Sequence, residues 1–149
     1  MRVLFDSSVI VAALVVSHPS HAACALQLNQ ALQQDIQGVI STHSLAEIYS
    51  VITRLPLQIP IRPQLAQQQL AVNLQHFEFV PLLVEDYQAA IAQMVSLNLP
   101  GGGIFDALIA QAAIKANVDK LLTLNPKHFN RLGEVIARLV QVPHFSKSL

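Results

Sequence analysis

Residues 3–16 read VLFDSSVIVAALVV, an apolar stretch that one charged residue, Asp6, interrupts. The letters VLF, at residues 3–5, predict a buried strand that ends near Asp6, and the segment from Ser8 to Val16 predicts an apolar helix. An ionised carboxylate beside an apolar core is costly unless other groups pair with it. Asp6 is therefore expected to have a chemical role, and the rest of the chain must supply its partners.

Strands and helices alternate along the rest of the chain. Further buried strands are predicted at residues 37–41, 76–82, 120–124 and 134–142, a turn at 125–129, and further helices at 20–34, 41–55, 64–74, 84–99 and 104–118. This alternation is typical of an α/β domain whose mostly parallel sheet is covered by helices on both faces. The length of 149 residues and the hydrophobic content of 52% favour a single domain, residues 1–149, with a substantial core.

The charge of the chain is low and balanced. Nine basic and nine acidic residues give a net charge of zero, which excludes the bulk positive charge of a tight, sequence-indifferent nucleic-acid binder and leaves room only for a local basic patch. Charged residues make up 12% of the chain. A surface with so few charges favours association, and we expect a homodimer or a bound partner.

The sequence also bears on the compartment. The lone Cys24 cannot form an internal disulfide, which fits a reducing cytoplasm. Arg2 and the apolar run from Val9 to Val16 imitate a secretory signal, but Asp6 would then lie inside its apolar region. No apolar stretch reaches the roughly 20 residues that span a bilayer. We therefore expect a cytoplasmic protein without membrane contact.

Three carboxylates lie at positions that invite a chemical explanation. Asp6 ends the first strand, Glu47 lies beside the apolar stripe of its helix, and Asp106 begins the most apolar helix. Singly, Asp6 fits an N-cap and Asp106 fits an acid in the first turn of a helix. Glu47 likewise fits a capping box with Ser44. If the three acids instead meet beyond the carboxyl ends of the strands, only a bound cation or retained protons would relieve their repulsion.

Four segments, in this order, carry a family resemblance: FDSSVIVAAL (5–14), LAEIYSVITR (45–54), GGGIFDALIAQAA (101–113) and LLTLNPKHF (121–129). Together they resemble the PIN-domain ribonuclease family, in particular the VapC toxins of bacterial VapBC-type toxin–antitoxin pairs. The resemblance implies a three-layer α/β/α sandwich. It also implies that Asp6, Glu47 and Asp106 meet around Mg²⁺ or Mn²⁺ and that the protein cleaves RNA.

The resemblance carries two further implications. Asn125 falls where many members of the family have a fourth aspartate, and it offers an oxygen but no charge. This departure puts a second, tightly held metal ion in doubt, although Asn125 stays in the predicted catalytic set. A toxin of this type would also have a small antitoxin encoded beside it, which would cover the acidic pocket.

Residues close in sequence to the proposed ligands are candidates for supporting roles. Ser8 and Thr123 are predicted to hold the metal ligands through hydrogen bonds, although each hydroxyl fits a turn or cap equally well. Arg54, Lys127 and His128 are candidates to bind the RNA backbone, with ordinary surface charge as the alternative. The aromatic residues Tyr49 and Phe129 fit either base stacking or the core.

Other chemistries fit the sequence less well. The pairs His43/Glu47 and His18/His21 have spacings that bind zinc, but no cysteine cluster or HExxH accompanies them. The glycine triplet lacks the lysine of a Walker motif. Nucleophilic use of Asp6 would require further acids that the letters DSS do not supply. The non-enzymatic alternative is a PIN-like module that binds RNA or a partner protein without cleaving anything; Asn125 weakly favours it, and the three acids disfavour it.

Overall fold

A computed structural model describes residues 1–145, and its centre is an all-parallel, five-stranded sheet in the order β3-β2-β1-β4-β5. The strands are β1 (Arg2–Phe5), β2 (Gln37–Ser41), β3 (Glu78–Val80), β4 (Lys120–Leu122) and β5 (Val140–Gln141). The helices are α1 (Ser7–Leu14), α2 (His21–Leu32), α3 (Thr42–Arg54), α4 (Pro63–Asn73), α5 (Val84–Ser96), α6 (Gly103–Lys115), α7 (Pro126–Asn130) and α8 (Glu134–Ala137). The predicted fold class is confirmed.

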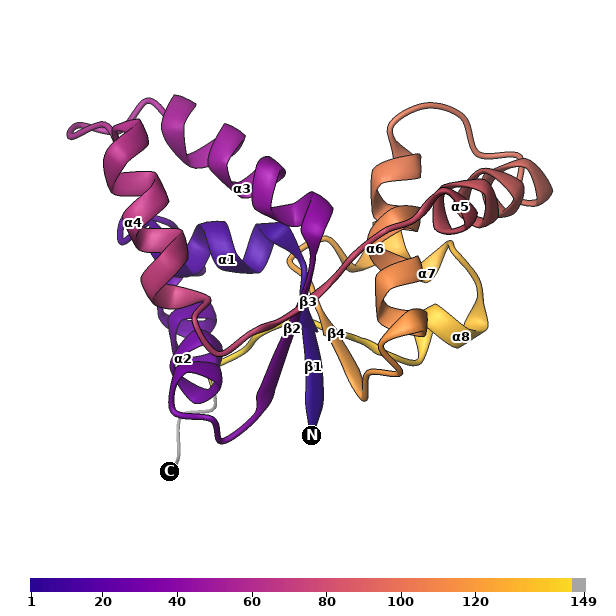
Figure 1. The fold of residues 1–149 in the computed structure, drawn as a ribbon, viewed down its shortest axis with the longest axis horizontal. Coiled ribbons are helices and arrows are strands. Elements are labelled where there is room, and N and C mark those ends of the chain that lie inside the picture. Colours follow the sequence, from indigo (N-terminus) through magenta and orange to yellow (C-terminus); the bar gives the residue numbers. More distant parts are fainter. Residues whose placement is uncertain (146–149) are drawn as a thin grey trace.

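Alternation along β1 divides the core between the two faces of the sheet. Val3 and Phe5 belong to the core that α1 to α4 cover, whereas Leu4 belongs to the core that α5 to α8 cover. Figure 1 shows the sheet nearly edge-on with these two sets of helices on opposite sides. Because the strand is buried on both faces, its three letters VLF are all apolar.

The order of the strands reverses next to β1. Leu4 lies opposite Val39 of β2 on one side and opposite Leu121 of β4 on the other. The chain runs outward from β1 through β2 to β3 and then crosses to the other side of β1 to form β4. In open parallel sheets such a reversal leaves a crevice at the carboxyl ends of the two central strands, where ligands bind. Asp6 follows β1 and Thr123 follows β4, so both lie at this crevice.

Two predicted segments differ in the structure. The strand predicted over residues 134–142 is wrong in its first half, because Gly133, at φ 111°, begins a helical turn in which the Ala137 N–H donates to the Gly133 carbonyl. Only Val140–Gln141 pairs with β4. The turn predicted at residues 125–129 begins a short helix, since Pro126 at its first position needs no acceptor for an N–H. Within residues 1–145 no helix combines the length and apolar character needed to cross a bilayer.

Candidate active site

Asp6 is buried at the carboxyl end of β1, with 4% of its surface exposed. Its N–H donates to the Leu122 carbonyl at 2.9 Å, so the pairing of β1 with β4 extends to this residue and fixes its backbone. Asp6 occupies the N-cap position of α1, but its side chain makes no capping hydrogen bond. The capping explanation of its carboxylate therefore fails.

Two hydroxyls hold the Asp6 carboxylate. Ser8 Oγ and Thr123 Oγ1 both donate to Asp6 Oδ2, at 2.7 and 2.8 Å. Each hydroxyl also accepts a backbone N–H from the segment after β4: Leu124 N donates to Ser8 Oγ at 3.1 Å, and Asn125 N donates to Thr123 Oγ1 at 2.9 Å. The two hydroxyls thus connect Asp6 to the loop between β4 and α7.

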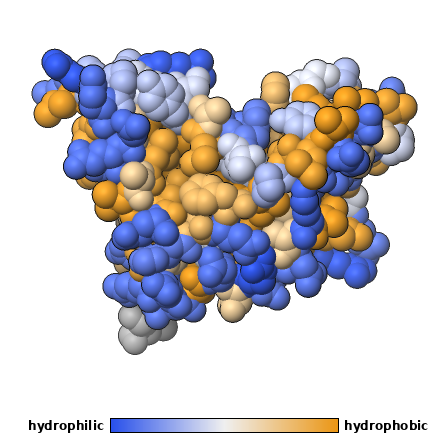
Figure 2. Space-filling view, viewed as in Figure 1, coloured by the Kyte–Doolittle hydropathy of each residue, from blue (hydrophilic) through white to orange (hydrophobic). Residues whose placement is uncertain are grey.

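Asp6, Glu47, Asp106 and Asn125 line one pocket of about 570 Å³ at this edge of the sheet. Glu47 projects from the middle of α3 and Asp106 from the first turn of α6, and both are partly buried. Figure 1 shows α3 and α6 on opposite sides of the carboxyl ends of the strands. Figure 2, seen from the same side, shows the surface notched between the α3–α4 side and the α5–α6 side.

The helix that carries Glu47 does not begin with the capping box that the sequence suggested. Ser41 is the N-cap of α3, and its Oγ accepts a hydrogen bond from the His43 N–H at 3.2 Å. Ser44 lies inside the first turn, where its hydroxyl is buried. Glu47 is therefore free of a capping role, and its carboxylate lies 3.6 Å from His43 Nε2.

Burial and mutual repulsion raise the affinity of the acids for protons. Burial raises the pKa of Asp6 from 3.8 to about 6, with a smaller contribution from the negative charges of Glu47 and Asp106, while the hydrogen bonds from Ser8 and Thr123 oppose the change. Burial also raises the pKa of Asp106; the nearby His128 and Arg131 oppose this, and Glu47 adds to it. The pocket is therefore a site in which negative charge is costly and a cation would be stabilised.

The donor set fits a hard cation that keeps part of its water shell. Within residues 1–145 no three His, Cys, Asp or Glu side chains lie close enough to hold one ion directly. An ion would therefore bind through one or two carboxylates of the pocket and through water, as Mg²⁺ commonly does. Zinc fits poorly at the His18/His21 pair, because His18 Nδ1 accepts from Ser20 N at 3.0 Å, which leaves the proton of the neutral ring on its other nitrogen.

The candidate RNA-binding residues differ in how close they lie to the acidic pocket. Lys127 and His128 lie exposed on α7, and His128 Nδ1 is 3.5 Å from Asp106 Oδ2. Arg54 lies exposed in the last turn of α3 and is not among the residues that line the pocket. Arg131 was not predicted. Its guanidinium covers Gly103, where an added Cβ would come within 2.6 Å of Arg131 Nη2.

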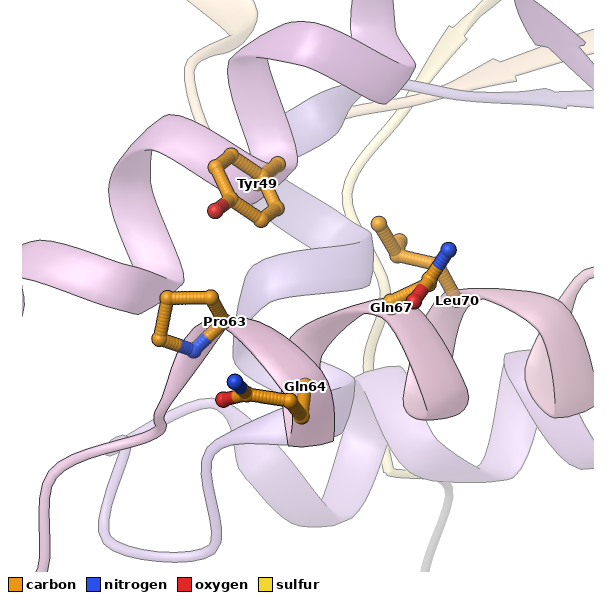
Figure 3. A pocket seen from close by; sticks show the side chains of 5 residues that line it. All are labelled: Tyr49, Pro63, Gln64, Gln67 and Leu70. Carbon is orange, nitrogen blue, oxygen red and sulfur yellow. The ribbon is translucent and has the colours of Figure 1, made fainter.

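Neither aromatic residue considered for stacking lies at the pocket. Phe129 is fully buried and belongs to the core of the second face. Tyr49 lines a separate pocket of about 510 Å³ between α3 and α4. Figure 3 shows its ring facing Pro63, Gln64, Gln67 and Leu70 of α4.

Comparisons with known proteins identify the family of this chain. The family model described as "PIN domain" matches residues 3–135, a range that includes Asp6, Glu47, Asp106 and Asn125. Ribonuclease VapC27 of Mycobacterium tuberculosis is 34% identical over 113 residues, covering 72% of this chain and 74% of that protein. Ribonuclease VapC40 of the same species is 31% identical over 118 residues, covering 79% of this chain and 82% of that protein.

Solved structures share the fold. VapBC2 from Rickettsia felis, in a crystal structure bound to a DNA fragment from its promoter, matches with a TM-score of 0.68 at 21% identity over 95% of this chain and 98% of the other. Mycobacterium tuberculosis VapC20, described as a Sarcin-Ricin loop cleaving toxin, matches with a TM-score of 0.63 at 14% identity over 80% and 86%.

Proposed function

This chain belongs to the PIN-domain family, and we propose that it is a divalent-metal-dependent endoribonuclease, the VapC-type toxin of a toxin–antitoxin pair, with its active site in the pocket of Asp6, Glu47 and Asp106. The observation that carries the proposal is the buried Asp6 carboxylate, which two hydroxyls orient toward a pocket lined by two further acids. Such an arrangement destabilises the protein without a cation, so a binding role explains it better than a structural one.

The residues of the pocket would have different roles toward a bound cation. Hydrogen bonds from Ser8 and Thr123 restrain Asp6 Oδ2, whereas Asp6 Oδ1 accepts no hydrogen bond from any residue in the range 1–145. Oδ1 is therefore the atom that would face a cation. Glu47 and Asp106 would share its charge, and Asn125 would add a neutral oxygen. When bound, Mg²⁺ or Mn²⁺ would supply charge neutralisation for the phosphate and an activated water.

The exposed basic residues of α7, together with Arg131 directly after it, would hold the RNA backbone. His128 and Arg131 lie beside Asp106, and Lys127 lies exposed on the same short helix. Phosphate contacts of this kind position a nucleic acid without reading its sequence. Because the whole chain is neutral, we expect RNA binding to be tighter with the divalent ion than without it and to fall with added salt.

The test is cleavage of a panel of tRNA and rRNA fragments by purified parent protein and by Asp6→Asn and Asp106→Asn, each with Mg²⁺, Mn²⁺ or EDTA. We expect cleavage by the parent with either metal, none with EDTA, and a loss of at least about 100-fold in both variants, since each removes a charged metal ligand. Asp35→Asn, which alters an exposed carboxylate outside the pocket, is the matched control. Equal cleavage by all four proteins would indicate a contaminating nuclease and refute the assignment.

A melting experiment separates the nuclease from the non-enzymatic alternative. A protein with the proposed site should melt at a higher temperature in Mg²⁺ or Mn²⁺, and Asp106→Asn should reduce this response without loss of the fold. A parent protein that binds RNA but shows neither cleavage nor a metal response would be a binding module.

An antitoxin would have a continuous surface to occupy. An apolar pocket of about 630 Å³ adjoins the acidic pocket along the chain, since Ser17 and Pro56 line the first while His18 and Leu55 line the second. Val16 and Ile59 at the apolar pocket are 80% and 84% exposed. A small partner could bury these two residues and place a basic group among the carboxylates.

The partner is tested by co-expression with the small protein encoded beside the gene. We expect the two proteins to co-purify and their complex to have no nuclease activity. The double variant Val16→Asp/Ile59→Asp should no longer bind the partner. Light scattering of the isolated chain tests the expected homodimer, which the low surface charge supports. A monomer at all concentrations would contradict that expectation and leave the nuclease unaffected.

A further inference from the structure

Two aromatic rings stack beside the acidic pocket. The rings of His43 and Phe105 have centroids 5.5 Å apart and an interplanar angle of 2°. His43 lies in the first turn of α3 and Phe105 in the first turn of α6, so the stack joins helices that cover opposite faces of the sheet (Figure 1). The centroid distance is in the range of favourable stacked pairs.

Half of Phe105 nevertheless remains in contact with solvent, with 51% of the residue exposed. His43 packs against one face of the ring, so the opposite face and the outer edge are the surfaces on which a further planar group could stack. A phenyl ring that is fixed on one side and open on the other contributes little to a core. It is the arrangement in which a further planar group can extend the stack.

Both ends of the stack are tied to acids of the pocket. Phe105 immediately precedes Asp106 in the chain, and His43 Nε2 lies 3.6 Å from Glu47 Oε2. A nucleotide base on the open face of Phe105 would therefore belong to a nucleotide whose phosphate lies at or next to the pocket. Bases in a duplex are already stacked on each other, so only an unpaired base is free to occupy this position.

We propose that Phe105, held in place by His43, is the platform on which an unpaired RNA base stacks beside the cleaved phosphodiester. The proposal rests on the proposed nuclease function and adds a residue that binds the substrate and selects single-stranded segments. It requires no base-specific hydrogen bond, and stacking on one aromatic ring tolerates any base.

The test measures binding of fluorescent single-stranded oligoadenylate, and of the same strand annealed to its complement, by anisotropy at low salt with EDTA. Phe105→Leu keeps an apolar side chain but removes the ring, Phe105→Trp enlarges the ring, and Phe79→Leu is the control. Phe79 is 42% exposed on the edge strand β3 and does not line the acidic pocket. Circular dichroism and melting temperature establish that each variant is folded.

We expect Phe105→Leu to weaken binding of the single strand about tenfold, the loss typical of one base–aromatic stack. Phe105→Trp should bind at least as well as the parent, and Phe79→Leu should match it. Affinity for the duplex should be the same in all four proteins. Unchanged single-strand affinity in Phe105→Leu, an equal loss for both forms of RNA, or no binding of oligoadenylate by the parent would each overturn the proposal.

Failure of this proposal and failure of the nuclease assignment give different results. If the parent cleaves RNA and Asp106→Asn does not, while Phe105→Leu binds and cleaves as the parent does, the platform alone is refuted. If no RNA is cleaved under any condition but Phe105→Leu still loses single-strand affinity selectively, the nuclease assignment fails and the stacking site stands.

Discussion

Asp6→Asn should make the metal-free protein more stable at neutral pH. Burial raises the pKa of Asp6 from 3.8 to about 6, and at about 1.4 kcal/mol for each pH unit the ionised carboxylate costs the folded state about 3 kcal/mol at neutral pH. The folded protein holds this proton more tightly than the unfolded chain does. The free energy of unfolding therefore falls as the pH rises from about 4 to about 6, and the loss persists above that range.

The asparagine in this variant retains what Asp6 gives to the fold. Its amide oxygen can still accept hydrogen bonds from Ser8 and Thr123, while its uncharged NH₂ group can face the pocket. We expect the free energy of unfolding of Asp6→Asn to exceed that of the parent by about 2 to 3 kcal/mol at neutral pH. Near pH 4 the difference should be close to zero. The difference between the two proteins isolates this group from the other acids that titrate.

Urea unfolding in EDTA at a series of pH values measures this difference, with Asp35→Asn as the control for an exposed carboxylate, expected to change stability by less than about 0.5 kcal/mol. In saturating Mg²⁺ the parent should become more stable than Asp6→Asn, because the ion stabilises only a protein that binds it. A variant less stable than the parent at neutral pH, or a difference that does not vary with pH, would refute the reasoning about the buried charge.

Three further substitutions have distinct expected outcomes. Gly38→Ala would place a Cβ 2.7 Å from the Phe77 ring, so it should lower the free energy of unfolding by about 1 to 3 kcal/mol in the same urea assay. Ser8→Ala removes a hydrogen bond that lowers the pKa of Asp6, so cleavage should fall about 10- to 100-fold and the acidic limb of its pH profile should move to higher pH. Asn125→Asp adds a like charge to the pocket, so it should lower metal-free stability by up to about 1 kcal/mol and tighten Mn²⁺ binding measured by calorimetry.

The strands and long helices could be predicted because their burial leaves a direct mark on the sequence. β1 is buried on both faces and reads as VLF, and α6 is buried along most of its length and is rich in Ala and Ile. The prediction of a strand over residues 134–142 was partly wrong because these residues are mostly apolar but show no clear strand or helix periodicity. A positive φ at Gly133 starts a helical turn there, and single-sequence patterns do not distinguish such a turn from a short strand.

The candidate ligands were visible as charges among apolar residues, and the prediction that Ser8 and Thr123 hold such a ligand through hydrogen bonds is confirmed for Asp6, but the geometry of these bonds was not visible. That Ser8 and Thr123 share one oxygen of Asp6 depends on the register of β1 against β4, which no local pattern encodes. Arg131 was missed because residues 125–129 were expected to form a turn, so its place beyond α7 was hidden. Phe105 was missed because its partner, His43, lies on a helix from the other face of the sheet.

The three acids differ in how firmly the protein holds them, and this difference suggests how a cation would act. Asp6 is fixed by the sheet and by two hydroxyls, whereas Glu47 and Asp106 each have an imidazole as neighbour, His43 at 3.6 Å and His128 at 3.5 Å. Glu47 and Asp106 also come from helices that cover opposite faces of the sheet. An ion bound to Asp6 would attract both, directly or through water, so its affinity depends on how the two helical layers pack. Loosening of either core should therefore weaken metal binding as well as stability.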